Sequence, residues 1–238
     1  MGKNKTAIVT GAQQGIGAGL VEGFLRSGYS VVATSLRASQ TLRSTPSLVV
    51  VDGDIRDPET ARKTVEAAVT HFGGIDVLVN NAGIFLTKPF TECTTDDFNA
   101  VVSINLLGFL HMTQPAVKQM LQQKSGCVIT ISAALVDNPI AGENASVAMI
   151  TKGGLNAVTW HLAMEYAKQG IRFNAVAPGV VDTPMHQENP KEALRALQPM
   201  GSIAEVSDIF DAVLYLANAR QVTGEVLHVD GGAHRGHW

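Results

Sequence analysis

The sequence predicts a single doubly wound α/β domain over residues 1–238, in which a seven-stranded parallel sheet has helices on both faces. Short runs of Val, Ile and Leu alternate with longer segments of helical periodicity, as in chains whose parallel strands are joined by crossover helices. Several runs are almost purely aliphatic, which is typical of strands covered on both faces. The chain has 238 residues and neither a low-complexity linker nor an internal repeat, so it fits one large domain.

The strands and helices can be placed in chain order. The expected strands are Ala7–Thr10, Ser30–Thr34, Leu48–Val51, Ile75–Asn80, Gly126–Ile131, Arg172–Ala177 and Val226–Val229. The expected helices are Gly15–Arg26, one that begins at Pro58 after an Asp57 N-cap, one from Thr95 past Asn105, Val147–Gln169 ending at Gly170, and Glu205–Ala217. About 13 residues separate the second and third strands, which leaves room for a loop with one helical turn but not for a full crossover helix.

The composition excludes several classes of protein. Hydrophobic residues make up 45% and charged residues 16%, and a net charge of -3 with no cluster of Lys or Arg argues against nucleic-acid binding. Cys93 and Cys127 lie far apart without metal-ligand spacing, so neither a disulfide framework nor a metal site is expected. The sequence has no signal peptide and no unbroken apolar run long enough to span a membrane, which predicts a cytoplasmic protein without a membrane segment.

A glycine-rich segment, Thr10–Gly17, lies where the first strand ends and the first helix begins. Gly11 permits a tight turn, Gly15 lets the backbone approach a pyrophosphate on the helix N-terminus, and Gly17 permits close contact of helix and strand. The spacing differs from the usual Gly-x-Gly-x-x-Gly, and an ordinary βα loop is the alternative interpretation. The position at the start of a βαβ chain favours a dinucleotide site. The residues expected to contact the cofactor here are Gly11, Gln13, Gln14, Gly15, Ile16 and Gly17.

This turn resembles the cofactor motif of the short-chain dehydrogenase/reductase family, and further motifs of that family follow in order across nearly the whole chain. They are Asn80-Asn81-Ala82-Gly83, Asn105, Lys152, Pro178–Met185, Thr223-Gly224 and Asp230-Gly231-Gly232. The resemblance implies a Rossmann fold, a nicotinamide cofactor and oxidoreductase activity similar to that of ketoacyl-carrier-protein reductases and glucose dehydrogenases. It also implies cofactor contacts from Asp54 and Ile55 at the adenine, from Asn81, Ala82, Gly83 and Lys152 along the riboses, and from Pro178, Gly179, Val181 and Thr183 near the nicotinamide.

The end of the second strand bears on the choice between NAD and NADP. An acidic residue there would bind the ribose hydroxyls of NAD, but the sequence has Ser35 and no Asp or Glu. Arg37, with Arg43 in the same loop, offers the guanidinium that a 2′-phosphate prefers. Ser35 and Arg37 are therefore the expected contacts, and NADP(H) is favoured over NAD(H). Two points stand against this choice: Gln14 replaces a basic residue that NADP enzymes of the family often have, and Arg37 has an alternative interpretation as a solvated side chain.

The family's chemistry uses a Tyr as acid/base, a Lys four residues later, a Ser, and an Asn on the preceding helix. A phenol has a pKa near ~10, and a neighbouring ammonium lowers it so that the group transfers a proton at neutral pH. By position the Lys is Lys152 and the Asn is Asn105, but residue 148 is Ala. The tyrosines of the chain, Tyr29, Tyr166 and Tyr215, do not match the catalytic position.

The serine and the proton donor are open at this point. Ser132 follows the fifth strand and is the expected catalytic serine, but an alternative register places Ala133 there and leaves the position without a hydroxyl. A water held by Lys152 and Asn105 could donate the proton. Ser146 could also do so, although a helix N-cap is its simpler interpretation. Lys152 itself could serve only the ribose hydroxyls.

The substrate side of the sequence is less specific. Thr183–Met200 is the expected substrate loop, and Phe85, Leu86, Val136 and Ile140 are further candidate walls for a small carbonyl compound or alcohol. The family resemblance implies a homotetramer. The tail Ala233–Trp238 either reaches a neighbouring subunit or is a disordered end.

Three functions are compatible with these features. The first is an NADP(H)-dependent carbonyl reductase or alcohol dehydrogenase with an atypical proton donor, acting on β-keto ester or ketoacyl substrates. The second is a regulator or scaffold that binds the cofactor without catalysis, which Ala148 favours. The third is another reaction type on the same fold. The nicotinamide-side motif Pro178–Thr183 favours the first, because a scaffold has no need of it.

Overall fold

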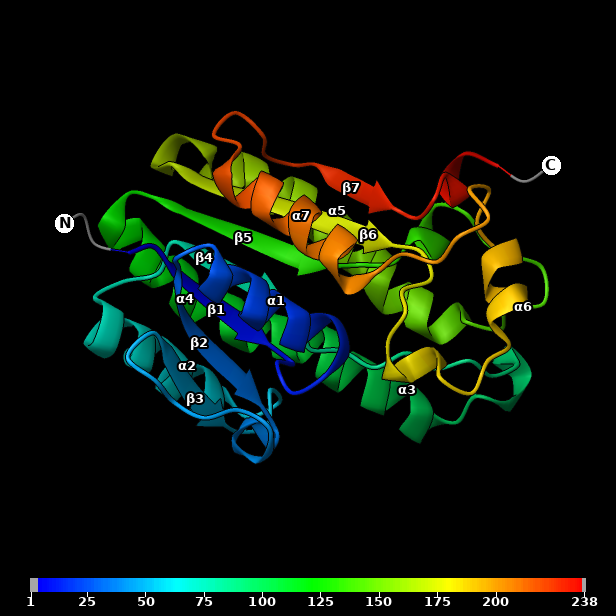
Figure 1. Ribbon diagram of the computed structural model, residues 1–238, viewed down its shortest axis with the longest axis horizontal. Coiled ribbons are helices and arrows are strands. Elements are labelled where there is room, and N and C mark those ends of the chain that lie inside the picture. Colours follow the sequence, from blue (N-terminus) through cyan, green and yellow to red (C-terminus); the bar gives the residue numbers. More distant parts are fainter. Residues whose placement is uncertain (1–3, 237–238) are drawn as a thin grey trace.

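Seven parallel strands form the central layer of the structure, a computed structural model that describes residues 4–236 (Figure 1). The strands are β1 (Thr6–Thr10), β2 (Ser30–Ser35), β3 (Leu48–Asp52), β4 (Val77–Asn80), β5 (Gly126–Ile131), β6 (Ile171–Pro178) and β7 (Val226–Val229). Their order in the sheet is β3-β2-β1-β4-β5-β6-β7. The chain runs outward from β1 to β3 and then returns to place β4 beside β1, which creates the switch point where doubly wound sheets bind ligands. The predicted fold class and all seven strands are confirmed.

Strand β4 begins later than its apolar sequence predicts. Ile75 is fully buried, but its N–H donates to the side chain of Gln123 at 2.9 Å, and the Gln123 amide donates back to the Ile75 carbonyl at 2.7 Å. The backbone of Ile75 is thus paired with an amide side chain in place of a neighbouring strand.

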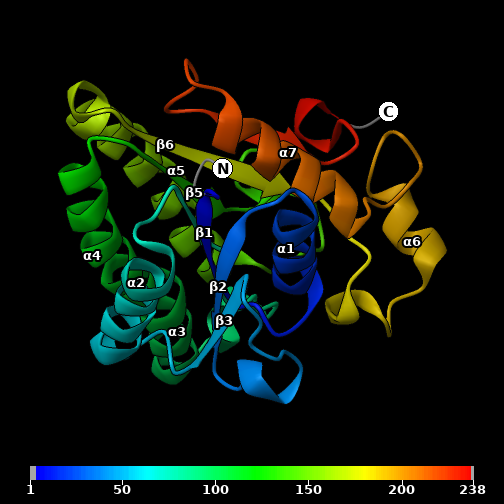
Figure 2. The same cartoon turned by 60° about the vertical axis from the view of Figure 1, so that its left-hand side comes forward.

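Two helix layers enclose the sheet (Figure 2). One layer holds α1 (Gly15–Arg26) and α7 (Val206–Asn218), and the other holds α2 (Pro58–Phe72), α4 (Gly108–Gln123) and α5 (Ser146–Tyr166). The shorter helices α3 (Thr95–Val102) and α6 (Lys191–Ala196) lie toward the carboxyl ends of the strands. Each layer buries its own apolar core against the sheet. On the α1 side, Phe24 is fully buried, with its ring centroid 5.0 Å from that of Tyr29 and 5.5 Å from that of Phe210.

Most helix ends follow the local sequence signals. The Asp57 side chain caps α2, as predicted. Helix α5 passes into a 3-10 turn, Ala167–Gln169, and the chain then reverses at Gly170, whose φ of +77° is the left-handed conformation that glycine adopts readily. Glu205 does not begin α7 but is its N-cap, in a reciprocal capping box with Asp208.

Helices α3 and α4 form one continuous helical run, Thr95–Gln123, joined by a π-helical turn at Ser103–Leu107. Within residues 4–236 this run is the one helix long and apolar enough, by length and composition, to resemble a membrane-spanning segment. Core helices pass the same test, and here α4 packs on α2 and on the sheet. The π-helical turn contains Asn105, and such turns often occur at functional sites.

The turn between β1 and α1 is packed closely enough to require glycine. Gly11 has a φ of +65°, and a Cβ at this position would lie 2.9 Å from the Cα of Ala82. A Cβ at Gly17 would lie 2.1 Å from the carbonyl oxygen of Gly11 and 2.6 Å from the amide nitrogen of Asn81. The first turn of α1 therefore rests directly on the end of β1 and on the segment that follows β4.

The substitution Gly17→Ala is expected to lower the free energy of unfolding by about 1–3 kcal/mol, because a backbone carbonyl must move to admit the methyl group. Urea titration measures this change. Gly154→Ala is the matched control, since its Cβ would lie 3.9 Å from the side chain of Leu106 in the middle of α5, where Ala favours the helix. Equal stabilities of the two variants would contradict the close packing of the turn.

Candidate functional site

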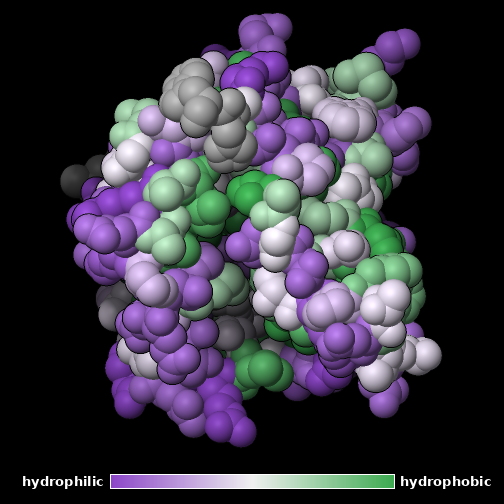
Figure 3. All heavy atoms as spheres, turned by 90° about the vertical axis from the view of Figure 1, so that its right-hand side faces the viewer, coloured by the Kyte–Doolittle hydropathy of each residue, from purple (hydrophilic) through white to green (hydrophobic). Residues whose placement is uncertain are grey.

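The carboxyl ends of the strands open onto one hollowed face of the molecule (Figure 3). Hydrophobic side chains line parts of the hollow, and hydrophilic side chains form much of its margin. A pocket at these strand ends is lined by Thr10, Ile55, Asn80, Ala82, Asn105, Gly108, Phe109, Thr130, Ile131, Lys152 and Leu155. Because β1, β4 and β5 all contribute to the lining, the pocket lies at the topological switch point.

The N-terminus of α1 forms a cradle suited to a pyrophosphate. Gly15 has a φ of +55°, no acidic residue lies in the first turn of α1, and the N-cap Gln14 makes no side-chain capping bond. The N–H groups of this turn are therefore free of a side-chain acceptor and can bind an anion. A Cβ at Gly15 would lie 3.6 Å from Thr183, so the segment after β6 bounds the cradle, while Ile16 packs on the core. The glycine pattern thus fits a dinucleotide.

Asn81 joins the glycine-rich turn to the end of β4. Its side-chain amide donates to the carbonyls of Thr10 at 2.9 Å and Gly11 at 3.2 Å. In return, the hydroxyl of Thr10 accepts from the N–H groups of Asn81 at 3.0 Å and Ala82 at 2.9 Å. These bonds set the spacing of the two strand ends between which a dinucleotide would lie.

The two arginines after β2 differ in availability. The Arg43 guanidinium turns back onto its own loop and donates to the carbonyls of Ser39 and, at 3.0 Å, Leu42. Arg37 is exposed, and within residues 4–236 its side chain has no hydrogen bond or ion pair. Ser35 is the last residue of β2 and is partly exposed. Of the two, Arg37 is the guanidinium free to meet a phosphate beside Ser35.

The loop that carries Arg37 is held in place from two sides, and it contains the single 3-10 turn that the sequence predicts, Ala38–Gln40. Asp52, at the end of β3, accepts from the N–H of Ser39 at 2.8 Å and from its hydroxyl. On the other side, the hydroxyl of Thr41 donates to the carbonyl of Gln13 at 3.4 Å. The loop that carries Arg37 is therefore tied to both β3 and the glycine-rich turn.

Asp54 and Ile55 lie on the segment after β3. Arg56 donates to both carboxylate oxygens of Asp54, at 2.6–3.0 Å, and this hydrogen bond lowers the pKa of Asp54. Ile55 lines the pocket and packs against Gly108, where a Cβ would lie 2.8 Å from the Ile55 side chain. Asp54 stays charged at neutral pH, and Ile55 supplies an apolar wall.

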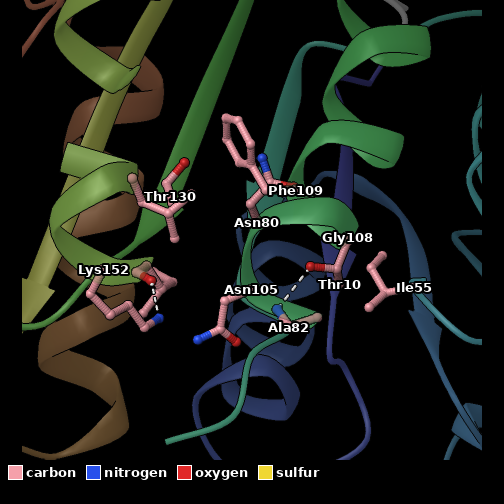
Figure 4. A pocket seen from close by; sticks show the side chains of 11 residues that line it. Thr10, Ile55, Asn80, Ala82, Asn105, Gly108, Phe109, Thr130 and Lys152 are labelled. Atoms are coloured by element: carbon pink, nitrogen blue, oxygen red, sulfur yellow. Dashed lines mark hydrogen bonds between the residues drawn. The ribbon is translucent and has the colours of Figure 1, made fainter. Parts of the chain in front are cut away.

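Gly83, Asn105 and Lys152 lie close together, although they are far apart in the sequence. A Cβ at Gly83 would lie 3.1 Å from the side-chain oxygen of Asn105 and 3.6 Å from Nζ of Lys152. Figure 4 shows the Asn105 and Lys152 side chains reaching the same space, one from the π-helical turn and the other from α5. The segment after β4 covers both groups, and glycine leaves room for them.

Lys152 is buried and has an unusual electrostatic setting. Its Nζ donates to the carbonyl of Ile131 at 2.7 Å, and within residues 4–236 it has no carboxylate partner. Desolvation lowers the pKa of Lys152 to about 8. Of the residues that line the pocket, Lys152 alone is titratable. The pocket therefore contains one group that can exchange a proton near neutral pH.

Asn105 is fixed by three hydrogen bonds. Its oxygen accepts from the N–H of Ile84 at 2.9 Å, and its nitrogen donates to the Ile84 carbonyl at 3.0 Å and to the Thr151 hydroxyl at 2.9 Å. Thr151 immediately precedes Lys152. Asn105 thus connects α5 to the segment after β4 and orients the surroundings of the lysine.

Ser132 is not among the residues that line the pocket. Its side chain is buried, and its hydroxyl donates to the amide oxygen of Asn156 at 2.5 Å, one turn of α5 beyond Lys152. Ala133, the alternative position for the catalytic serine, is partly exposed and has no hydroxyl. The structure therefore brings Asn105 and Lys152 together, whereas Ser132 is engaged elsewhere.

The start of α5 contains Ala148 and Ser146. Ala148 is fully buried, one helical turn before Lys152. Ser146 is exposed, and the interpretation of Ser146 as the N-cap is wrong, because the N-cap is Ala145 and no side chain caps this helix. The preceding loop is joined to the segment after β4 by a bond of 2.7 Å from the N–H of Lys88 to the carbonyl of Asn144.

The segment that is expected to contact the nicotinamide follows β6. Pro178 is the last residue of this strand, and a Cβ at Gly179 would lie 2.9 Å from the Cα of Asp230, so the C-terminal segment requires glycine there. Val181 is buried and forms a bridge to Ala204. Thr183 lies beside the glycine-rich turn, 3.6 Å from where a Cβ at Gly15 would be.

Three residues of the site are not predicted as site residues from the sequence. Thr10 and Thr151 act through their hydroxyls, and Asn156 is a buried amide whose nitrogen has no hydrogen-bond partner within residues 4–236. The signal for Thr10 is its position at the start of the glycine-rich segment. Asn156 could have been found from its position four residues after Lys152, on the same face of the helix.

Comparisons with known proteins agree with this geometry. A family model described as enoyl-(acyl carrier protein) reductase matches residues 11–234. The chain is 33% identical over 248 residues to 3beta-hydroxysteroid dehydrogenase 1 of Eggerthella lenta, with 97% of this chain and 94% of that protein covered. It is 31% identical over 249 residues to a 3-oxoacyl-[acyl-carrier-protein] reductase of Staphylococcus aureus, with 98% and 100% covered.

Solved structures give the same result. ElxO with NADP bound superimposes with a TM-score of 0.90 at 30% identity, covering 98% of this chain and 100% of that chain. A 3-ketoacyl-(acyl-carrier-protein) reductase from Brucella melitensis, complexed with NADH, has a TM-score of 0.90 at 28% identity, with 98% and 99% covered. The fold, the glycine cradle and the relatives lead to one conclusion: this chain belongs to the short-chain dehydrogenase/reductase family of oxidoreductases.

Proposed function

We propose that this protein is an NADP(H)-dependent oxidoreductase that interconverts a carbonyl compound and an alcohol, with a proton donor other than tyrosine. The observation that supports this most directly is the buried Lys152 ammonium beside Asn105, in a pocket next to the glycine cradle, with Ala at position 148. A group that can transfer a proton thus lies in the pocket beside the glycine cradle, and two similar solved structures contain NADP or NADH.

The residues divide the work of binding and proton transfer. A bound nicotinamide cofactor supplies or accepts the hydride. The cradle of α1 binds the pyrophosphate, Asp54 and Ile55 flank the adenine, and the segment Pro178–Thr183 contacts the nicotinamide. Lys152 holds the nearby ribose and, as an ammonium, gives the carbonyl oxygen its proton directly or through a water that Asn105 helps to place.

Two assignments are possible for the position at which the family has its catalytic serine: Ser132 or Ala133. Ser132 was the sequence-based choice, and rotation of its side chain away from Asn156 would be needed for substrate contact. The existing hydrogen bond favours the alternative, in which Ala133 occupies the family's serine position and Ser132 instead orients α5 through Asn156. Ser146, exposed at the start of α5, is the remaining hydroxyl near the substrate side.

The substrates proposed are β-keto esters and related ketoacyl compounds. The relatives of this chain include ketoacyl reductases and a 3beta-hydroxysteroid dehydrogenase. Apolar side chains are exposed beside the site, with Met185 at 63% and Met200 at 77%. Such side chains suit an apolar substrate better than a multiply charged one.

A catalytically inactive cofactor-binding protein is the second candidate. Ala148 favours it, because no phenol lines the pocket and the alanine methyl is fully buried. Measurable turnover of a carbonyl compound would distinguish the oxidoreductase from the inactive cofactor-binding protein.

Replacing Lys152 by Met tests the proposed proton donor. We expect reduction of β-keto esters, followed by NADPH absorbance, to fall roughly 10²–10⁴-fold, the usual contribution of a general acid. In the unchanged protein, reduction is expected to decline as pH rises through about 8, because the ammonium form of Lys152 is lost above its lowered pKa. Alcohol oxidation is expected to rise over the same interval.

Cofactor affinity and a surface control complete that experiment. The variant Lys168→Met, on the exposed 3-10 turn after α5, should retain full activity. If Lys152→Met lost activity only in proportion to weaker NADPH binding, the lysine would serve the ribose alone. Tight NADPH binding by an unchanged protein that reduces no β-keto ester, diketone or activated aldehyde would support the cofactor-binding function instead.

The choice of NADP(H) is tested by Arg37→Ala. Loss of a guanidinium hydrogen bond to a 2′-phosphate costs about 1.5–3 kcal/mol, so the Kd of NADPH should rise roughly 10–100-fold while that of NADH stays nearly unchanged. Calorimetry measures both. Arg43→Ala is the control, because Arg43 already donates to its own loop. A similar loss of affinity for both cofactors in Arg37→Ala would contradict the assignment.

We also propose a homotetramer. Helices α3 to α5 lie side by side, and their outer faces expose large apolar side chains: Phe98, Leu107, Leu110, Ile150, Trp160 and Met164. Exposed apolar surface of this extent on adjacent helices is typical of a subunit interface.

The substitution Trp160→Glu should split the tetramer into smaller species, since it places a charge in the apolar face at a side chain that is 50% exposed. Light scattering after gel filtration measures the mass. Met185→Glu, at a 63% exposed methionine on the substrate loop, should leave the mass unchanged. A Trp160→Glu protein of unaltered mass would place the interface elsewhere.

A further inference from the structure

Two histidines form an ordered cluster at the C-terminal end of the described chain, outside the cofactor site. The rings of His228, on β7, and His234, on the 3-10 turn Ala233–Arg235, are stacked with centroids 3.9 Å apart and an interplanar angle of 17°. His228 bonds through Nε2 to Asp137 at 2.8 Å, and His234 bonds through Nδ1 to Asp230 at 2.9 Å. An ionised carboxylate only accepts, so each ring nitrogen is the donor.

The cluster is anchored firmly on its C-terminal side. The Asp230 carboxylate is buried and also accepts from the N–H groups of Gly232 at 3.0 Å and His234 at 2.8 Å. Gly231 and Gly232 adopt left-handed φ values of +60° and +89°, which complete this tight turn. The His234 ring is therefore held in one orientation and offers a fixed surface to His228.

The same C-terminal turn holds one wall of the substrate cleft. The carbonyl of Gly231 accepts from the N–H of Met200 at 3.1 Å, at the end of the substrate loop. Gln198, which is buried, packs against Gly231 and donates to the carbonyl of Val180 at 2.9 Å. The substrate loop thus ends on the turn that carries His234.

Asp137 lies on the opposite wall. It directly follows the 3-10 turn Ala134–Val136 in the loop between β5 and α5, and this loop contains Ala133 and ends at Ala145, just before Ala148. The 3-10 turn itself contacts the C-terminal turn, and Figure 1 shows both at the carboxyl end of the sheet. Within residues 4–236, the bond to His228 is the hydrogen bond that ties the Asp137 carboxylate to the C-terminal segment.

We propose that His228 and His234 are positioning residues that clamp the β5–α5 loop to the C-terminal turn and so fix the distance between the two walls of the substrate cleft. The role assigned to the cleft rests on the proposed function, but the clamp itself does not. The rings are only 16% and 18% exposed, which separates this cluster from solvated surface pairs of little energetic effect. Asp137 is 43% exposed, so its release would loosen the loop without leaving a buried charge.

Hydrogen exchange of the NADPH-bound protein, read by mass spectrometry, tests the clamp without relying on turnover. In His228→Leu, amide exchange over residues 134–145 should accelerate about threefold or more, while the strands of the sheet keep their protection. His228→Gln retains an N–H donor and should restore most of the protection. His71→Leu is the control, since His71 is an exposed histidine on α2 that bonds only within its own helix.

The outcomes distinguish the clamp from a general structural role. Unchanged exchange of residues 134–145 in His228→Leu would overturn the proposal, and so would an equal acceleration throughout the sheet or a failure of His228→Gln to rescue. If the protein turns over a ketone, the clamp further predicts a raised KM with little change in kcat for His228→Leu and an unchanged Kd for NADPH. A loss confined to kcat would contradict it. Because exchange is measured on the cofactor complex, a protein without turnover still tests the clamp.

Discussion

The burial of the Lys152 amine beneath the segment after β4 is the constraint on which the site depends. Within residues 4–236 Nζ has one acceptor, the Ile131 carbonyl, and no counter-ion. Removing a cation from water without a partner costs free energy, and this cost is visible as a pKa lowered to about 8. Packing around the lysine must therefore hold it in place. Groups maintained against such a cost are concentrated at functional sites.

The packing around the lysine is held by a series of hydrogen bonds. Asn105 bonds at once to Ile84 and to Thr151, and Thr151 bonds through its hydroxyl to the carbonyl of Ala148. The segment after β4, the π-helical turn and the start of α5 are far apart in sequence but form one rigid frame around the lysine. Ala148 belongs to this frame and is fully buried, so neighbouring atoms pack against its small side chain on all sides.

The sequence predicts the strands, helices and glycine turns of this protein better than the hydrogen-bond partners of its buried side chains. Strand and helix positions follow from aliphatic runs and capping residues, which act locally, and the glycine positions follow from backbone geometry that other residues rarely adopt. The orientation of Ser132 depends on Asn156, a partner 24 residues away, and no local pattern reveals such a pair. The stacking of His228 on His234 likewise depends on how the chain turns at Asp230.

The absence of a phenol does not by itself remove the source of protons. An unperturbed tyrosine has a pKa near ~10, whereas burial lowers the pKa of Lys152 to about 8, so its ammonium is the stronger acid of the two. In the proposed function no tyrosine donates the proton, and the Lys152 ammonium transfers its own. A buried lysine, an asparagine that orients its surroundings and a complete cofactor cradle are more than a scaffold requires. These features support the proposal that Lys152 transfers a proton to a reactive carbonyl.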